Sequence, residues 1–404
     1  MNKDDTLDKT INQFVDELMN NDTDDSSPEP KTFSPGRGRI ILIILIAATI
    51  AACYFAYANR SYSSYSIQQR IDRSSVDTTN YMSYDDNLFS YSRDGASLAD
   101  FEGNPIWNES FDMENPVCDI NGDYILVYDR EHTGAVILDD SGRVGSLSMT
   151  LPIVRASVAG NGDTAVLMQE QDTAYIRLFH PDGDIIASGE IHATNSGYPV
   201  AMDLSSDARR LLVSLLDLND GDIKTTLCFY DFVDKDNVDK NHIMANFSYS
   251  DEVIPQVAFL GENAAVAVAD EELIFFDFHK DITVRNRVFL SQEIENVFYS
   301  NNRAAIITSQ QTDKGKSWDV LHVYSESGAE RFIKHIPASM SYAGFMDNGE
   351  IVLHNGRKIR IFRDDGKEKL KAKSEESIRA IFPWDGLRNY YFITKDETQR
   401  VILQ

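Results

Sequence analysis

The sequence predicts an all-β protein, a β-propeller, preceded by one transmembrane helix and a short cytoplasmic tail. Three observations lead to this prediction. An uncharged apolar run near the N-terminus is long enough to cross a bilayer. A unit of short strands then recurs at nearly even spacing to the C-terminus, which is typical of propellers. The alternation of apolar and polar residues in this region is short, and stretches with a helical period are absent.

The chain is strongly acidic. Its 404 residues include 64 Asp and Glu against 38 Lys and Arg, and the formal net charge is -26. Such a chain cannot neutralise a run of phosphates, so we expect no nucleic-acid partner. The same balance disfavours adhesion to an anionic membrane surface. The simplest interpretation is that the acidity keeps an exposed domain soluble, and binding of cations or basic partners is the alternative.

Residues 1–39 form the predicted cytoplasmic tail. Within residues 6–20, six apolar side chains recur at helical spacing and share one face, and a linker rich in Ser, Asp, Pro and Gly follows. The six are Leu7, Ile11, Phe14, Val15, Leu18 and Met19. Because so short a helix is marginal when alone in water, one hypothesis is that it docks into a groove of a cytoplasmic partner. The alternative is a disordered tail with accidental periodicity.

The apolar run at residues 40–58 is the predicted transmembrane helix. Its nineteen residues carry no charge and show no polar stripe, unlike the core helix of a soluble protein. Lys31, Arg37 and Arg39 lie close before the run, whereas Arg60 is the near basic residue after it. This bias favours a cytoplasmic N-terminus. We therefore expect a single-pass protein of the cell membrane, with a juxtamembrane segment at 59–76 and an extracytoplasmic domain at 77–404.

A cleaved signal peptide is the alternative interpretation of the apolar run. Ala56-Tyr57-Ala58 resembles a small-x-small cleavage site. The tail before the run is much longer than a typical n-region, and the apolar core exceeds a typical h-region. These lengths favour an uncleaved anchor.

The recurring unit is an apolar strand followed by a second strand and a turn of Asp, Ser, Asn and Gly. One equivalent position in each unit is held by Ala99, Leu138, Phe179, Tyr230, Phe276, Tyr324, Phe362 and Leu403. Successive separations are 39, 41, 51, 46, 48, 38 and 41 residues. Four short strands with three turns need about forty residues or slightly more, so each unit corresponds to one propeller blade.

Eight units predict an eight-bladed propeller, and a seven-bladed ring is the main alternative because the first and last units are the least regular. The last unit ends after its third strand. The segment from Ile67 to Val76 is available to supply its missing outer strand, which would pair the two ends of the chain and remove a free sheet edge. Separate β-sandwiches are a weaker alternative because they do not explain the repeat spacing.

The hairpin pattern resembles that of the PQQ-like (quinoprotein-type) propeller superfamily. More narrowly, the chain resembles uncharacterised bacterial proteins that carry such a propeller on one N-terminal membrane helix, over residues 74–404 and the anchor. The resemblance rests on turn glycines, namely Gly103, Gly142, Gly183, Gly328 and Gly366. The superfamily's tryptophan-docking motif ends in Gly, three residues and Trp, and Gly103 with Trp107 matches it once. A quinone dehydrogenase usually repeats this motif. Its single occurrence here is a departure from that pattern, and the departure argues for a propeller without a cofactor.

Residue patterns for catalysis or metal binding are absent from the sequence. None of the eight histidines forms an HxH or HxxxH pair, and neither a Gly-x-Ser-x-Gly elbow nor a phosphate loop occurs. A weak acidic loop contains Asp217, Asn219, Asp220 and Asp222. Its glycine is one place early for an EF-hand and the twelfth-position Glu is missing, so a solvated hairpin loop is favoured over calcium. We predict no catalytic, cofactor-binding or metal-binding residue.

Three cysteines suggest an exported bacterial protein rather than a disulfide-rich secreted one. Cys53 lies in the apolar run, and we expect Cys118 and Cys228 to be buried, free thiols.

These features favour a non-enzymatic binding or scaffold protein of the cell envelope. Its partner would be a protein or another envelope ligand, with a cytoplasmic protein at the tail helix. Two alternatives remain. One is a divergent quinoprotein-like or hydrolytic propeller enzyme, for which fold analogy is the only support. The other is a transmembrane sensor that couples the ectodomain to the cytoplasmic partner through the tail.

Overall fold

The structure is a computed structural model that describes residues 37–73, 78–218, 221–232, 243–311, 317–338 and 340–404. The chain divides into two compact units, the first ending at Ala58 and the second running from Asn59 to Gln404. In the first unit, helix α2 (Arg37–Ala58) covers the predicted apolar span and begins three residues earlier. Its segment Ile41–Ala58 has a mean hydropathy of 2.4 and is long enough to cross a membrane. The predicted tail helix at 6–20 lies outside the described residues.

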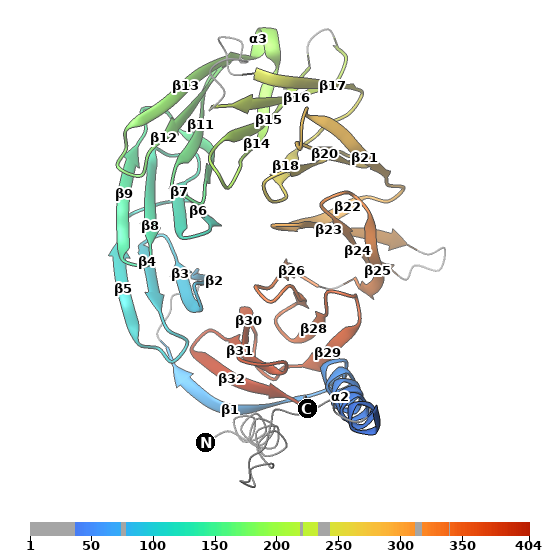
Figure 1. The fold of residues 1–404 in the computed structure, drawn as a ribbon. Helices are drawn as coiled ribbons and strands as arrows, with labels where there is room; N and C mark the ends of the chain where they lie inside the picture. Colours follow the sequence, from blue (N-terminus) through green and yellow to red (C-terminus); the bar gives the residue numbers. More distant parts are fainter. Residues whose placement is uncertain (1–36, 74–77, 219–220, 233–242, 312–316, 339) are drawn as a thin grey trace, which may run out of the picture. The chain divides into compact units, whose positions relative to one another are not determined.

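The second unit is a ring of eight four-stranded antiparallel sheets, each of which is one blade (Figure 1). Blade 1 contains β2 (Asn80–Tyr84), β3 (Asn87–Tyr91), β4 (Gly95–Ala99) and β5 (Pro105–Ser110). Blade 2 contains β6 (Pro116–Asn121), β7 (Tyr124–Asp129), β8 (Gly134–Asp139) and β9 (Gly142–Ser148). Blade 3 contains β10 (Ile153–Val158), β11 (Thr164–Glu170), β12 (Thr173–Phe179) and β13 (Ile185–His192). The short helix α3 (Ala193–Ser196) leads to blade 4, which contains β14 (Tyr198–Leu204), β15 (Arg210–Asp217), β16 (Lys224–Asp231) and β17 (Ile243–Ser250).

The other four blades repeat the same order. Blade 5 contains β18 (Gln256–Phe259), β19 (Ala264–Val268), β20 (Glu272–Asp277) and β21 (Thr283–Phe289). Blade 6 contains β22 (Ile294–Ser300), β23 (Arg303–Gln311), β24 (Ser317–Ser325) and β25 (Glu330–Pro337). Blade 7 contains β26 (Tyr342–Phe345), β27 (Ile351–His354), β28 (Lys358–Phe362) and β29 (Glu368–Lys373). Blade 8 combines β30 (Ala380–Trp384), β31 (Asn389–Ile393) and β32 (Glu397–Leu403) with β1 (Tyr65–Asp72). The eight-bladed prediction is confirmed, and the seven-bladed alternative is wrong.

Strand β1 closes the ring by pairing antiparallel with β32, from Tyr65 opposite Leu403 to Asp72 opposite Glu397. The closure was predicted for Ile67 to Val76, and the strand begins two residues earlier. Tyr65 packs edge-on against Phe392 with ring centroids 4.8 Å apart, so the N-terminal strand also contributes to the core. The outer edge of blade 8 is therefore made by residues near the start of the second unit.

The hydrophobic core is divided among the eight interfaces between neighbouring blades. The interface of blades 3 and 4, for example, is filled by Leu178, Met202 and Leu211. The smallest buried cluster joins blade 8 to blade 1, where Phe101 stacks on Tyr391 with centroids 4.3 Å apart. Because each blade buries both of its faces against its neighbours, the sequences of its central strands are nearly continuous apolar runs.

Before β1, residues Asn59 to Tyr62 form a short strap along the outer edge of blade 7. The Tyr62 amide donates to the Lys369 carbonyl at 2.8 Å, and the Lys371 amide donates to the Tyr62 carbonyl at 3.2 Å. Asn59 accepts from the Lys367 ammonium at 3.1 Å. Tyr62 itself is buried between blades 7 and 8. The strap therefore holds the beginning of the second unit against blade 7 before the chain enters blade 8.

Turn glycines let one blade dock against the next. The Phe332 ring of blade 6 covers Gly366 of blade 7, and a Cβ added at Gly366 would lie 2.5 Å from that ring. The indole of Trp107 lies in the same way against Gly142 of blade 2. Gly366 also has a φ of +76°, a conformation that side chains disfavour.

We expect Gly366→Ala to lower the free energy of unfolding by about 2 kcal/mol, because the methyl group meets both the left-handed backbone and the Phe332 ring. Gly134→Ala is the matched control, since Gly134 has no positive φ and a Cβ there meets no atom within 4 Å. Urea denaturation of the two full-length variants makes the comparison. Equal midpoints would show that the turn glycine is not needed for docking.

Candidate binding site

The candidate site residues that the sequence analysis named lie in different parts of the structure. Gly103 and Trp107 belong to the turn and outer strand of blade 1, where Trp107 packs on Phe89 with centroids 6.1 Å apart. Asp217 ends β15, and Asp222 is exposed. Asn219, Asp220 and the six apolar tail residues lie outside the described residues. Among the described residues, His, Cys, Asp and Glu do not gather into a group suited to hold a metal.

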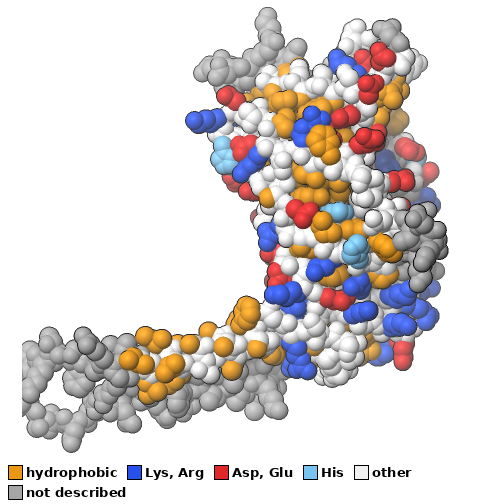
Figure 2. All heavy atoms as spheres, turned by 90° about the vertical axis from the view of Figure 1, so that its right-hand side faces the viewer, with side chains coloured by type: hydrophobic (Ala, Val, Ile, Leu, Met, Phe, Trp, Pro, Cys, Tyr) orange, Lys and Arg blue, Asp and Glu red, His pale blue; other side chains and the backbone are white. Residues whose placement is uncertain are grey.

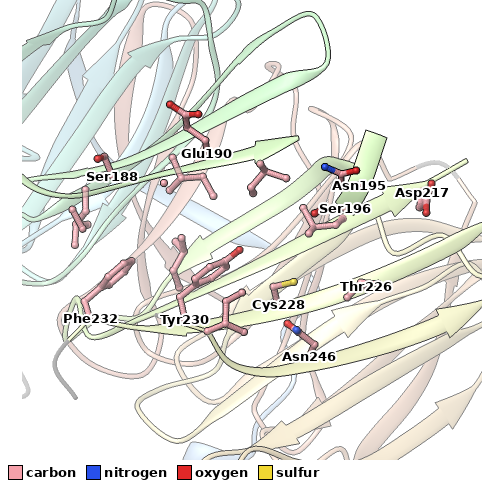
Figure 3. A pocket seen from close by; sticks show the side chains of 18 of the residues that line it. Ser188, Glu190, Asn195, Ser196, Asp217, Thr226, Cys228, Tyr230, Phe232 and Asn246 are labelled. Carbon is pink, nitrogen blue, oxygen red and sulfur yellow. The ribbon is translucent and has the colours of Figure 1, made fainter. Parts of the chain in front are cut away.

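A groove of about 580 Å³ opens between the outer parts of blades 3 and 4 (Figure 3). Blade 3 contributes β12 and β13, blade 4 contributes β15, β16 and β17, and α3 lies at one end. Leu178, Leu211 and Leu215 form its floor, which is the outer part of the core between these blades. Its volume is in the range of protein pockets that bury a ligand or a few side chains.

A small residue at the docking position of blade 3 contributes to the groove. The docking position of a blade is the residue of its outer strand that pairs with the last residue before the β-bulge in its third strand. Blades 1, 6 and 7 place Trp107, Phe332 and Leu370 there. Blade 3 places Ala187 there, opposite Leu178. Blades 2 and 4 also have small residues at this position, Gly145 and Ala245, and at Gly145 the backbone of Pro181 fills the space. The missing side-chain volume leaves the floor uncovered, and Gly189, two residues further on the same face, adds none.

Other apolar side chains of blades 3 and 4 are exposed outside the groove. Ile185 and Leu218 are 56% and 57% exposed, and Ile223 and Met244 are exposed as well. Single exposed apolar residues of this kind are ordinary on a protein surface, so the groove itself is the apolar feature of this region. Polar groups lie at the rim, including Glu190, Asn195, Asp217 and Lys224.

Cys228 and Tyr230 lie in the groove wall and are protonated at neutral pH. Burial raises the pKa of the Cys228 thiol to about 11 and also raises the pKa of the Tyr230 hydroxyl. A thiol nucleophile needs its pKa lowered toward neutrality. The groove wall therefore offers apolar contact and hydrogen bonds rather than nucleophilic chemistry. Cys228 and Cys118 are both free, as expected, although Cys118 is only half-buried.

A second cleft, of about 700 Å³, lies at the turns of blades 1, 7 and 8. Its lining includes five acidic residues, namely Asp86, Asp100, Glu102, Asp347 and Asp385. Trp384 lies in the same cleft, but the Arg400 guanidinium already lies over its ring, 3.4 Å from the centroid. The aromatic face that a cationic ligand would use is thus occupied by the chain's own arginine.

The inner strands of four blades are joined by two half-buried carboxylates, which the sequence analysis did not single out. Asp119 of blade 2 accepts from the Val158 amide of blade 3 at 2.8 Å. Asp203 of blade 4 accepts from the Ser157 hydroxyl of blade 3 at 3.1 Å and from the Phe259 amide of blade 5 at 2.7 Å. The only signal in the sequence is an acidic residue inside an apolar first strand.

The environment of this pair favours the protonated carboxyl. Burial, followed by the charge of Asp119, raises the pKa of Asp203 to about 7. Burial also raises the pKa of Asp119, and the nearby Arg155 charge opposes both shifts. Perturbed carboxyls often mark functional sites. Here Asp119 and Asp203 accept hydrogen bonds from neighbouring blades and so hold the inner strands together, which is a structural reason for their position.

We expect Asp203→Asn to stabilise the fold at pH 8 and to have less effect at pH 5. The pKa of Asp203 is higher in the folded state, so folding binds a proton between pH 4 and 7 and stability falls as the pH rises through this range. The amide of Asn keeps an acceptor oxygen but carries no charge. At about 1.4 kcal/mol for each pKa unit, the free energy of unfolding at pH 8 rises by up to about 4 kcal/mol. Urea denaturation at both pH values measures it. A variant less stable than wild type at both would contradict the assignment.

Comparison with known structures shows the same fold in distant proteins. BamB from Moraxella catarrhalis matches with a TM-score of 0.51 and 11% identity, over 84% of this chain and all of BamB. A eukaryotic initiation factor matches with a TM-score of 0.52 and 9% identity, over 82% of this chain and 87% of its own. At these identities the likeness shows the propeller fold alone. No curated protein matches the sequence.

A family model covers nearly all of the second unit. It matches residues 58–403, which include the strap, the closing strand and all eight blades. The chain therefore belongs to the family of unknown function DUF5711.

Proposed function

We propose that this protein is a non-enzymatic binding scaffold anchored in the membrane by α2, and that the groove between blades 3 and 4 takes an apolar segment of a partner protein. The observation that carries the proposal is the uncovered apolar floor beside Ala187 and Gly189. Apolar surface with a polar rim is what protein interfaces present.

The free edges of the outer strands suit an extended segment. β13 and β17 are the last strands of their sheets, so one edge of each has no strand partner. A segment in extended conformation pairs with such an edge through its backbone and places alternate side chains into a neighbouring pocket. Ala187 and Gly189 leave room for two such side chains, because they are two residues apart on one face.

The anchoring proposal rests on the composition of α2. Its span carries no charged residue, and Arg37 and Arg39 lie at its N-terminal end, which favours an N-terminus in the cytoplasm and a propeller on the other side. A signal sequence passes the same test of length and hydropathy, so the two interpretations differ in whether α2 stays on the mature protein. The binding proposal is the same in both.

Gly189→Trp tests the groove, because an added side chain meets no atom within 4 Å at its Cβ and enters the groove without disturbing the core. We expect the amount of extracytoplasmic partner that is captured to fall at least about tenfold, because the added side chain blocks a central contact. In-cell crosslinking of the tagged full-length protein, quantified by mass spectrometry, measures the captured proteins.

Gly134→Trp in β8 is the matched control, since Gly134 is equally free of neighbours at its Cβ and lies away from the groove. Thermal melting confirms that both variants fold. The proposal is wrong if Gly189→Trp captures the same proteins as wild type, or if the control loses them to the same extent.

A further inference from the structure

The outer strands of the ring differ in how their free edges are protected. Proteins often place basic residues on an edge strand, because the charges keep other chains from pairing with its backbone. Five outer strands, namely β1, β9, β21, β25 and β29, carry Lys or Arg, and Figure 2 shows such side chains where β25 and β29 lie. β5, β13 and β17 carry none, and β13 and β17 border the groove between blades 3 and 4.

The pairing register shows which backbone groups of β13 face its free edge. The Ala193 amide donates to the Asp172 carbonyl at 2.8 Å. In an antiparallel pair the bonded positions alternate, so every second amide counted back from Ala193 points toward β12. The amides of Ser188 and Glu190 therefore point outward, and neither donates to a backbone carbonyl of the described residues. These are the groups that a further strand would bond.

The side chains along the two edges favour β13 over β17. A strand added to β13 places every second side chain beside Ala187 and Gly189, which leave the apolar floor of the groove open. A strand added to β17 places them beside Asn246 and Ser248, and the Ser248 hydroxyl lies 3.1 Å from that of Thr226. Apolar side chains of a partner therefore meet apolar surface at β13 and polar groups at β17.

An acidic residue lies beside the opposite face of such a strand. Side chains alternate across a strand, so Ser188 and Glu190 point away from the groove (Figure 3). The Glu190 side chain is 61% exposed, and its carboxylate lies 4.0 Å from the His192 imidazole. Opposite charges on neighbouring strands stabilise their pairing. A basic residue at this position also suits a protein whose net charge is -26.

We propose that the partner segment is a β-strand added to the free edge of β13, with apolar residues at every second position and Lys or Arg between them. This inference deepens the proposed function and rests on it. The apolar residues enter the groove beside Ala187 and Gly189, and a basic residue lies beside Glu190. Backbone bonds to the outward groups of β13 provide affinity, and the alternating side chains provide specificity.

A synthetic peptide serves as the probe for this pattern. A labelled peptide of alternating Val and Lys is titrated with the purified full-length protein in detergent, and fluorescence anisotropy measures its affinity. The control peptide has the same composition with its Val and Lys residues grouped, so it carries the same charge without the alternation. We expect the alternating peptide to bind at least about tenfold more tightly, because all its Val side chains share one face. Glu190→Gln should weaken its binding about twofold to fivefold.

Proline substitution identifies the edge that the peptide uses. Proline lacks an amide hydrogen and is tolerated in an edge strand where that hydrogen would face solvent. Ser188→Pro therefore removes a donor toward the added strand and keeps the bonds between β12 and β13. Ser248→Pro is the matched control, since the bond from the Asp251 amide to the Ile223 carbonyl gives β17 the same alternation. We expect Ser188→Pro to weaken peptide binding at least about tenfold and Ser248→Pro to leave it unchanged. Thermal melting confirms that both variants fold.

The outcomes separate this inference from the proposed function. If Gly189→Trp reduces capture in cells but Ser188→Pro leaves peptide binding unchanged, a segment occupies the groove without pairing to β13, so the inference is wrong and the proposed function stands. A larger effect of Ser248→Pro also overturns the inference, because it assigns the strand to β17. Equal affinities of the two peptides for the wild type contradict the alternating pattern. If Gly189→Trp captures the same proteins as the wild type, the proposed function fails and the inference fails with it.

Discussion

The pairing of β1 with β32 is the constraint on which the rest of this structure depends. Blade 8 has only three strands from the C-terminal end of the chain, and residues 65–72 complete it. The smallest buried cluster of the ring lies beside this blade, between blades 8 and 1, so side-chain packing alone holds that seam weakly. The backbone bonds of the closing strand bring the two ends of the chain together and remove the edge that β32 would otherwise expose.

Closure by an N-terminal strand ties the ring to whatever precedes it. Helix α2 ends at Ala58, the strap occupies Asn59 to Tyr62, and β1 begins at Tyr65. The strap pairs with β29 of blade 7, and the next residues cross to blade 8. The short connection therefore joins the end of α2 directly to blades 7 and 8.

Side-chain volume at one repeated position contributes to how closely neighbouring blades pack. Phe332 covers the turn glycine of the next blade, whereas Ala187 leaves the floor between blades 3 and 4 exposed. The same backbone pattern thus provides a packed interface in one place and a groove in another. A large residue such as Phe332 supports packing between blades, and the small Ala187 leaves room for a ligand between blades 3 and 4.

Much of the fold was predictable from the sequence because repeats and an apolar run are local patterns. The spacing of Ala99, Leu138 and their equivalents predicted the blade count, and the truncated last unit predicted closure. The groove was not predictable, because it depends on pairing Ala187 with Leu178 and on comparing that position across blades. The Asp119 and Asp203 bonds join residues tens of positions apart.

Hydrogen exchange of the full-length protein tests the central claim that β1 is part of the closed ring. If the strand completes blade 8, the amides of β1 that bond to β32 exchange as slowly as those of β31, because both open only when the blade unfolds. Exchange of β1 as fast as that of an unpaired linker, with β31 still protected, would contradict the account and would separate the ring from the segment that precedes it.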